Sequence, residues 1–390
     1  MFISPRFAFL CLIIQKFVDL TSLKFKEPMS KIKLIKSRFS QIEIGELYVS
    51  SLVRLIEEKY GSCRVCIVVD ENTHDYCLDY FISLHPLFES AEIILLPVGE
   101  ENKVMEVCFQ VWEALTEYNF SRKDLVINLG GGLVTDMGGF IASIFKRGMD
   151  FIHVPTSLLG MVDASIGGKT GIDMGNYKNQ LGVINHPKAI FIDPIFLKSL
   201  PAKEIIYGYA EMLKHALIRD KNLWEEIKFI RNDEDLTTTA ILLKSIKIKV
   251  TIIDEDPLEG GLRKILNFGH TIGHGLEGYF LGKTNLAHGH CVALGLCAES
   301  YLSWQKGLLS KDEYIDIENC IRRSFHFISI TAEEITEIIK LIHNDKKNSN
   351  DQIKCSLLSG IGSCLYDQVV TEDEIANSLF HLNLLASSVN

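Results

Sequence analysis

The stretch "LVINLGGGLVTDMGGFIAS", residues 125–143, decides which fold the sequence is expected to adopt. An apolar run typical of a buried strand is followed by Gly130, Gly131 and Gly132, and then by a helical pattern. Glycines at a strand-to-helix turn allow the backbone to approach a pyrophosphate, whose charge the N-terminus of the helix favours. The turn is not a G-x-G-x-x-G fingerprint, so these residues alone are equally consistent with a plain tight turn.

Similar apolar runs occur on both sides of this stretch. "RVCIVVD", "EIILLPV", "FIHVP" and "AIFID" are short and rich in Ile and Val, and helix-length amphipathic stretches such as "KVMEVCFQVWEALTEY" lie between several of them. This alternation predicts a largely parallel sheet that is covered by helices. After Pro201 the strand signals nearly stop. We therefore expect the α/β class, with a Rossmann-like parallel-sheet domain at residues 29–201 and a mostly α-helical domain at residues 202–390.

The composition limits the partners and the compartment. The formal net charge of -10 disfavours a nucleic-acid or membrane-surface partner, so an anionic ligand would need a locally basic pocket. The ten cysteines have no framework spacing. Cys63 and Cys66 form a C-x-x-C that leads into a strand, and strand-edge thiols are favoured there over a redox or zinc pair. A reducing cytosol is the expected compartment.

Polar residues follow several of the predicted strands. Asp70 and Asn72 end "CIVVDEN", Glu100 and Lys103 lie in "GEENK" after the next strand, and "VPTSLLGMVD" ends another. Because the carboxyl ends of parallel strands meet at one edge of a sheet, these residues and the glycine turn are expected to line one crevice. The sequence therefore predicts a dinucleotide site.

A second group of residues indicates a metal site. Five polar residues follow one another at steps of four, three, four and three: Arg263, Asn267, His270, His274 and Glu277. These steps predict one stripe on a helix, and the neighbouring glycines are typical of a site wall rather than a solvated face. Two histidines four apart can both bind a metal, or one can bind it while the other transfers a proton.

Further ligands are available nearby. His288 and His290 begin another predicted helix, and Glu211 shares a helix face with Lys214 and His215. One Glu and two His leave coordination positions open for substrate, as in catalytic zinc sites. The alternative is a set of unrelated histidines on helix surfaces.

Taken together these segments resemble the 3-dehydroquinate synthase family. The resemblance runs from about Asp70 to the "DKK" at residues 345–347, through "GGGLVTDMGGF", "KRGMDFIHVPTSLLGMVDASIGGKTGID", "YKNQLG", "YAEMLKHALI", "EGGLRKILNFGHTIGHGLE" and "HGHCVALG". It implies metal ligands Glu211, His270 and His290, with His274 as a proton-transfer and orienting histidine. His288 is not expected to be a ligand.

The resemblance also implies the other site residues. The NAD contacts would be Asp70, Asn72, Glu100, Lys103, Gly131, Gly132, Asp136, Thr156, Ser157 and Lys178. The catalytic and substrate residues would be Asp163, Lys169, Asn179, Lys214, Lys249, Glu259, Arg263, Asn267 and one of Lys346 or Lys347. Arg147 resembles the family arginine that reaches the site of the partner subunit, which implies a homodimer.

The family's reaction explains why an anion-binding loop and a metal helix would occur together. Its substrate, 3-deoxy-D-arabino-heptulosonate 7-phosphate, carries a carboxylate and a phosphate. The resemblance implies one zinc or cobalt ion per subunit as a Lewis acid, and an NAD that takes a hydride and returns it after phosphate has left. A lyase of the shikimate pathway, located in the cytoplasm, is therefore expected.

Some alternatives remain open at this point. Lys249 could be one of several solvated helix lysines, and Asp136 could simply favour a helix N-terminus. A polyol or iron-type alcohol dehydrogenase would share the fold and the metal site, but it would not need the convergent lysines. A sister sugar phosphate cyclase is another alternative. The intact "GHTIGH" favours the dehydroquinate product but does not exclude an amino-analogue synthase.

The first 28 residues are expected to be a non-essential extension. "MFISPRFAFLCLIIQKF" has an apolar run too short to span a bilayer, and no small-residue cleavage site follows it. A signal peptide is the alternative. We predict that a chain starting at Met29 is recovered in the soluble fraction and keeps the full activity, measured side by side with the 390-residue chain. Loss of folding in the shorter chain would contradict this.

Overall fold

The computed structural model describes residues 32–175, 177–230, 233–281, 283–284, 286–343 and 352–387. The extension predicted at residues 1–28 lies outside the described residues, and so do Lys346 and Lys347. All statements below concern the described part of the chain.

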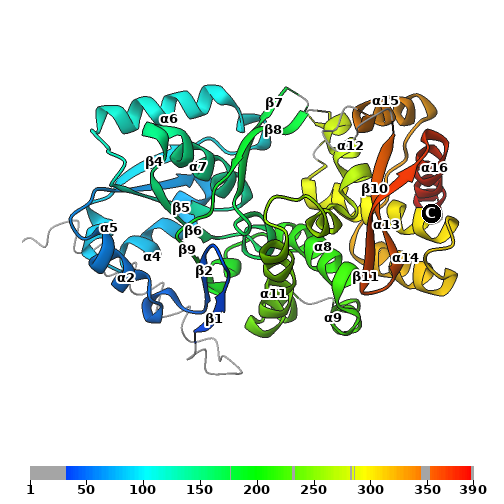
Figure 1. Cartoon of the computed structure of the whole chain (residues 1–390), viewed down its shortest axis with the longest axis horizontal. Helices are drawn as coiled ribbons and strands as arrows, with labels where there is room; N and C mark the ends of the chain where they lie inside the picture. Colours follow the sequence, from blue (N-terminus) through cyan, green and yellow to red (C-terminus); the bar gives the residue numbers. More distant parts are fainter. Residues whose placement is uncertain are drawn as a thin grey trace, which may run out of the picture. The chain divides into compact units, whose positions relative to one another are not determined.

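A seven-stranded sheet carries the first part of the chain (Figure 1). Its strand order is β1-β2-β9-β6-β5-β3-β4. The β1–β2 pair is antiparallel and every other neighbouring pair is parallel, which confirms the predicted α/β fold class. Its strands are β1 (Lys33–Lys36), β2 (Gln41–Ile44), β3 (Val65–Asp70), β4 (Glu92–Leu96), β5 (Leu125–Gly130), β6 (Asp150–Pro155) and β9 (Ala189–Ile192).

Side chains of the central strands are buried on both faces of the sheet, as expected for parallel strands under helices. On β3, Val65, Ile67 and Val69 belong to one core cluster, whereas Cys66 and Val68 belong to a second cluster on the opposite face. Residues of helices α6 (Met105–Glu117) and α7 (Gly132–Ile144) complete the second cluster. The short helical segments of this part are η1 (Leu47–Val49), α2 (Leu52–Leu55), η2 (Ile56–Tyr60), α3 (Glu71–Thr73), η3 (His74–Leu78), α4 (Asp79–Ile82), α5 (Pro86–Glu89) and η4 (Glu100–Asn102). They are followed by α6 (Met105–Glu117), α7 (Gly132–Ile144), η5 (Phe145–Arg147), η6 (Gly160–Ala164) and η7 (Pro194–Lys198).

Helices dominate after Pro201, as predicted. They are α8 (Ala202–Arg219), α9 (Lys221–Ile227), α10 (Asp233–Leu236), α11 (Thr239–Glu255), η8 (Leu262–Asn267), α12 (His270–Phe280), α13 (His288–Gln305), α14 (Lys311–Ser324), α15 (Ala332–His343) and α16 (Glu372–Ser387). Among the described helices, none combines sufficient length with sufficient apolar character to cross a bilayer.

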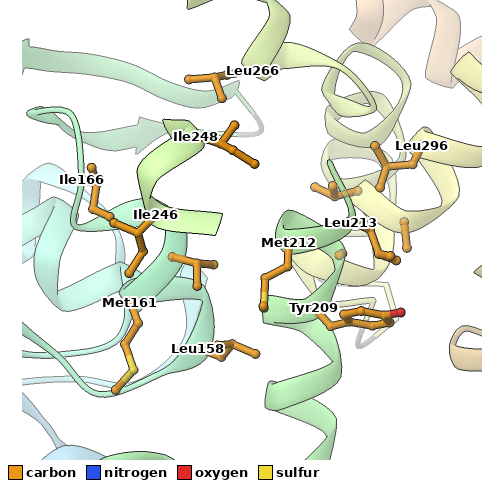
Figure 2. Close-up of a cluster of buried hydrophobic side chains, with 14 of the residues drawn as sticks. Leu158, Met161, Ile166, Tyr209, Met212, Leu213, Ile246, Ile248, Leu266 and Leu296 are labelled. Atoms are coloured by element: carbon orange, nitrogen blue, oxygen red, sulfur yellow. The ribbon is translucent and has the colours of Figure 1, made fainter. Parts of the chain in front are cut away.

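Helix α8 contacts α11, α13, η6 and η8, so several functional segments share its core. Figure 2 shows Tyr209 and Met212 of α8 near Leu158, with Met161 of η6 and Ile246 of α11 in the same apolar cluster. All five side chains are at most 1% exposed. The site segments are therefore anchored to one continuous core.

Two antiparallel hairpins were not predicted. β7 (Lys169–Met174) pairs with β8 (Tyr177–Ile184), and β10 (Ile353–Gly360) pairs with β11 (Ser363–Val370). β10 is mostly buried and packs on α13, whereas β11 is mostly exposed. Neither β10 nor β11 has a clean alternation of apolar and polar residues. The sequence pattern typical of a half-buried strand was therefore weak.

The predicted helical stripe over residues 263–277 is broken in the structure. The segment η8 ends at Asn267, and α12 begins at His270 after Gly269, whose φ of 79° is left-handed. Glu299 accepts hydrogen bonds from the N–H groups of Gly269, at 2.7 Å, and Ile272, at 3.0 Å, so a buried carboxylate caps the new helix. A Cβ at Gly295 would lie 1.9 Å from the Gly269 carbonyl oxygen, which means that α12 and α13 are in direct backbone contact there.

We predict that Gly138→Ala destabilises the fold. A Cβ at Gly138 would lie 1.8 Å from Oδ1 of Asn128, which is fully buried on β5, so α7 would be pushed from the sheet. The expected loss in the free energy of unfolding is about 1–3 kcal/mol, measured by urea denaturation. Gly260→Ala is the matched control, because a Cβ there meets only Asp256 Oδ1 at 3.9 Å. Equal stability of the two variants would contradict the packing assignment.

Candidate active site

The glycine turn opens the N-terminus of α7 toward the edge of the sheet. Gly131 is the N-cap of this helix, and the N–H of Thr156 at the end of β6 donates to the Gly130 carbonyl oxygen at 3.0 Å. A Cβ at Gly131 would lie 3.1 Å from Ser157 Oγ. Gly131 and Gly132 are partly exposed, so a ligand can approach this turn at the positive end of a 13-residue helix.

The other predicted nucleotide residues lie at the same edge of the sheet. Asp70 ends β3, which pairs with both β4 and β5, and its Oδ1 accepts a hydrogen bond from the Thr73 N–H at 2.7 Å. Asn72 is exposed on the short helix that follows. The ends of β3, β4, β5 and β6 are consecutive in the sheet, so the predicted residues share one edge.

Lys103 connects three of the predicted residues. Its Nζ donates to Asp136 Oδ2 at 2.7 Å and to Asn179 Oδ1 at 2.8 Å, and it lies 3.8 Å from Glu100 Oε1. Burial alone would lower the pKa of Lys103, but the carboxylates of Asp136 and Glu100 raise it. The ammonium is therefore a fixed positive charge beside the nucleotide edge.

Lys178 links this edge to the helical part of the chain. Its Nζ lies 2.6 Å from Glu100 Oε1, 3.0 Å from Asp173 Oδ2 and 3.2 Å from Glu277 Oε1. These carboxylates come from η4, β7 and α12. Burial opposes the charge of Lys178, but the three carboxylates raise its pKa, so one ammonium holds three elements together.

A buried charge cluster surrounds Asp163 of η6. Its Oδ1 lies 2.7 Å from Lys249 Nζ, 3.5 Å from Lys214 Nζ and 3.4 Å from His215 Nε2. Although burial opposes ionisation, the two lysines hold the pKa of Asp163 well below its usual range. Burial lowers the pKa of Lys249 to about 8, so this residue is not one of the solvated helix lysines.

Glu211 on α8 is the centre of a group with metal-ligand geometry. The residue is fully buried, and its Oε1 lies 3.3 Å from His270 Nε2 and 3.6 Å from His288 Nε2. One ligand atom from each of these residues lies within 4.8 Å of the others. The ammonium of Lys214 also contacts Glu211. One carboxylate and two imidazoles are a donor set that suits zinc and related divalent ions.

The electrostatics of this group favour a cation. Despite its burial, Lys214 and His270 hold the pKa of Glu211 well below its usual range. Burial lowers the pKa of His270 to about 4, which keeps a ring neutral for coordination. Burial alone would also lower the pKa of His288, but Glu277 and Glu211 raise it to about 10. The carboxylates thus favour a positive charge at this ring, which either a proton or a metal ion supplies.

The structure places one predicted ligand, His290, away from Glu211. His290 Nε2 lies 2.7 Å from the carbonyl oxygen of His326, and its ring packs against Phe325 and His326. Among the described residues it belongs to no group with metal-ligand spacing, whereas His288 does. Positions two apart on a helix point to different faces, so only one of these two histidines can face Glu211. That residue is His288, which was not expected to be a ligand.

His274 lies beside the metal group, as predicted. Its ring centroid is 5.2 Å from that of His270 and 5.9 Å from that of His288. It also forms a second group of metal-ligand spacing with Glu277 and His288. Its position suits proton transfer next to a bound cation.

The loop "SIGGKTG" is fixed by groups from the helical part. Arg263 is buried, and its two terminal nitrogens donate to the carbonyl oxygens of Gly167 at 2.9 Å and Pro257 at 2.6 Å. Gly167 has φ 105°, and a Cβ there would lie 2.8 Å from Arg263 Nη2. Lys169 Nζ pairs with Glu259 Oε2 at 2.5 Å, and Asn267 Nδ2 donates to Glu259 Oε1 at 2.8 Å. These predicted residues therefore lie together.

Arg147 is not brought to this cluster by any described contact. It is exposed in η5 with a φ of 68°. Three residues of the site carried no predicted role: Glu277, Asp173 and His215. Glu277 ended the polar stripe and His215 shared a face with Glu211, so spacing could have found both. Asp173 lies in the hairpin that was not predicted, and nothing in its pattern marked it.

Comparisons with known proteins identify a family. Two family models match the chain: 3-dehydroquinate synthase N-terminal at residues 93–207, and 3-dehydroquinate synthase C-terminal at residues 208–348. A 3-dehydroquinate synthase of Parabacteroides distasonis is 36% identical over 354 residues, which are 90% of this chain and 98% of that protein. One from Nitratiruptor is 37% identical over 322 residues, which are 82% of this chain and 90% of that protein.

Solved structures share the fold. A 2-epi-5-epi-valiolone synthase from Streptomyces hygroscopicus, with NAD+ and Zn2+ bound, has a TM-score of 0.74 at 24% identity and covers 91% of this chain and 99% of its own. A 2-deoxy-scyllo-inosose synthase complexed with carbaglucose-6-phosphate, NAD+ and Co2+ has a TM-score of 0.78 at 21% identity, covering 90% and 99%.

The corrected ligand set predicts opposite results for two neighbouring histidines. His288→Gln should lower the divalent metal content well below one ion per chain, because an imidazole facing Glu211 is lost. His290→Gln should keep the metal, because its ring faces His326. Elemental analysis of both purified variants after zinc loading and desalting measures this, with circular dichroism as the check on folding. Metal loss in the His290 variant alone would restore the original assignment.

Proposed function

The chain belongs to the 3-dehydroquinate synthase family, and we propose on that basis that it converts 3-deoxy-D-arabino-heptulosonate 7-phosphate into 3-dehydroquinate and phosphate. The observation that carries this proposal is the grouping of Glu211, His270 and His288 next to buried lysines, which contact Glu211 directly or through Asp163. The reaction class would be that of a carbon–oxygen lyase. The substrate needs both the metal group and the lysines. The metal would polarise its hydroxyl groups, and the lysines would hold its two anionic groups.

The cations near the loop "SIGGKTG" suit an acidic sugar phosphate. Those available for its carboxylate and phosphate are Lys169, Lys214, Lys249 and Arg263. In the described structure their charges are balanced by Asp163, Glu211 and Glu259 or directed at backbone oxygens. An arriving anion would share these cations with the carboxylates and carbonyl oxygens that already contact them.

We propose that Glu211, His270 and His288 hold one divalent ion, zinc or cobalt. The fit rests on the fully buried carboxylate and on two imidazole Nε2 atoms that face it. When bound, such an ion supplies Lewis acidity to substrate hydroxyl oxygens. His274, next to the group, is placed to hold or move a proton at a ring nitrogen. The relatives solved with Zn2+ or Co2+ support this choice of metals.

We propose that NAD occupies the edge of the sheet where β3, β4, β5 and β6 end. The open backbone at Gly131 and Gly132 suits a pyrophosphate, and Asp70 and Asn72 lie at the end of a neighbouring strand. Bound there, NAD supplies a hydride acceptor that is restored within the same turnover. The chain's own part is to fix the cofactor and to keep water from the reacting carbon.

The remaining predicted properties are proposals as well. A division into a nucleotide-binding domain at residues 29–201 and a metal- and substrate-binding domain at residues 202–390 agrees with where the sheet ends and the long helices begin. A homodimer in the cytoplasm, with Arg147 reaching the partner's site, follows from the family resemblance. The exposed position of Arg147 leaves it accessible to a second subunit.

Two other functions share this fold. Glycerol and iron-containing alcohol dehydrogenases are structural neighbours at 13–15% identity, with TM-scores between 0.55 and 0.62. Sister cyclases are neighbours at 21–24% identity. Relatives named 3-dehydroquinate synthase reach 33–37% identity over most of the chain, which favours the dehydroquinate product.

Redox balance separates the synthase from a dehydrogenase. Turnover of the heptulosonate phosphate with NAD and zinc should release one phosphate per substrate, with no lasting rise in NADH absorbance. A phosphate assay and absorbance at the NADH band, recorded together, measure this. Stoichiometric NADH from glycerol, without phosphate release from the sugar phosphate, would contradict the proposed function.

Lys169→Ala should cripple turnover while leaving NAD affinity nearly unchanged. Removing a cation that faces a substrate anion costs roughly 2–5 kcal/mol, which is about 30-fold or more in kcat/KM. Lys264→Ala is the matched control, because that lysine is paired with Asp367 away from the loop. Steady-state kinetics and NAD titration by fluorescence measure the two effects. Equal kcat/KM in both variants would remove Lys169 from the site.

A further inference from the structure

Glu277 touches the metal group without being required as a ligand. It lies on α12 one turn beyond His274 and is 6% exposed. Its Oε2 is 2.9 Å from His288 Nδ1, and its Oε1 is 3.2 Å from Lys178 Nζ. Each carboxylate oxygen therefore has its own partner.

The contact determines which nitrogen of His288 can bind a cation. Because the proton on Nδ1 is donated to Glu277, the ring can bind a cation only through Nε2, which lies 3.6 Å from Glu211 Oε1 and loses its own proton when the ion binds. A carboxylate that accepts the second ring N–H of a ligating histidine fixes its tautomer and orientation and raises its basicity. A ring held this way keeps its orientation when the ion replaces the proton on Nε2.

We propose that Glu277 is the positioning residue of the metal site, that it presents His288 through Nε2, and that Lys178 holds Glu277 in place. The inference rests on the metal-binding part of the proposed function. A buried carboxylate beside one imidazole would be poorly compensated alone, and the Lys178 ammonium supplies the missing counter-charge. Asp173 and Glu100 keep that ammonium fixed from the other side.

The rival arrangement has Glu277 as a ligand, together with His274 and His288. It is disfavoured because both oxygens of Glu277 are already engaged, one by the Nδ1 of His288 and one by Lys178. In that arrangement His288 would bind through Nδ1 and turn away from Glu211. The two arrangements predict different spectra for a bound cobalt ion.

The test is zinc affinity of the full chain, measured on metal-free protein by competition with a chromophoric chelator. Glu277→Ala should weaken zinc binding about 10- to 100-fold. Glu277→Gln should weaken it less, because the amide oxygen still accepts the Nδ1 proton. Glu318→Gln is the matched control: Glu318 lies 3.8 Å from His381 in a carboxylate–histidine pair between α14 and α16, and its loss should leave zinc affinity unchanged.

The visible spectrum of bound Co2+ shows whether Glu277 is a positioning residue or a metal ligand. Glu277→Gln loaded with Co2+ should keep the visible band positions of the original chain, since the ligands are the same. Shifted bands would show that Glu277 is itself a ligand and would overturn the inference, as would unchanged zinc affinity in Glu277→Ala. If Glu277→Ala fails to fold, the affinity and spectrum of Glu277→Gln decide. These measurements use no substrate. A chain that binds zinc as expected but releases no phosphate from the sugar phosphate would therefore contradict only the proposed reaction.

Discussion

The burial of Glu211 next to Lys214 is the interaction on which the rest of the site depends. A fully buried carboxylate is costly unless opposite charges and hydrogen-bond donors surround it. Lys214 itself needs Asp163, and Asp163 in turn balances Lys249. These partners come from η6, α8 and α11, so the charges are compensated only when the three segments pack as they do. The apolar cluster around Met212 provides that packing.

The fold was largely predictable from the sequence because its signals are local. Buried parallel strands such as Val65–Asp70 are continuous apolar runs, and the glycine turn marks the strand-to-helix change. The break at Gly269 was not predictable, because it depends on Glu299, thirty residues away, and on contact with α13. The polar steps of four and three continue across the break and therefore suggested one helix.

Most residues of the site were predictable from the sequence, but the direction in which each side chain points was not. Spacing and resemblance selected Glu211 and His270, and the structure brings them together. They selected His290 rather than His288 as the third ligand, and the spacing of the two residues gave no reason to prefer either. Helix α13 is buried on nearly all sides near its start, so apolar periodicity carries no information about which face meets α12. Only the three-dimensional contacts with Glu211 and His326 separate the two rings.

The direct contact between α12 and α13 has a consequence for how this protein can change over generations. Because Gly295 meets the Gly269 carbonyl oxygen without any intervening side chain, main-chain atoms set the separation of the two helices. His270 and His288 begin these helices, so their spacing is set in part by main-chain contact and less by the sizes of the surrounding core residues. Sequence drift can exchange one apolar side chain for another nearby and leave the distance between the imidazoles unaltered. A methyl group at position 295 would be the smallest inherited change to move them apart.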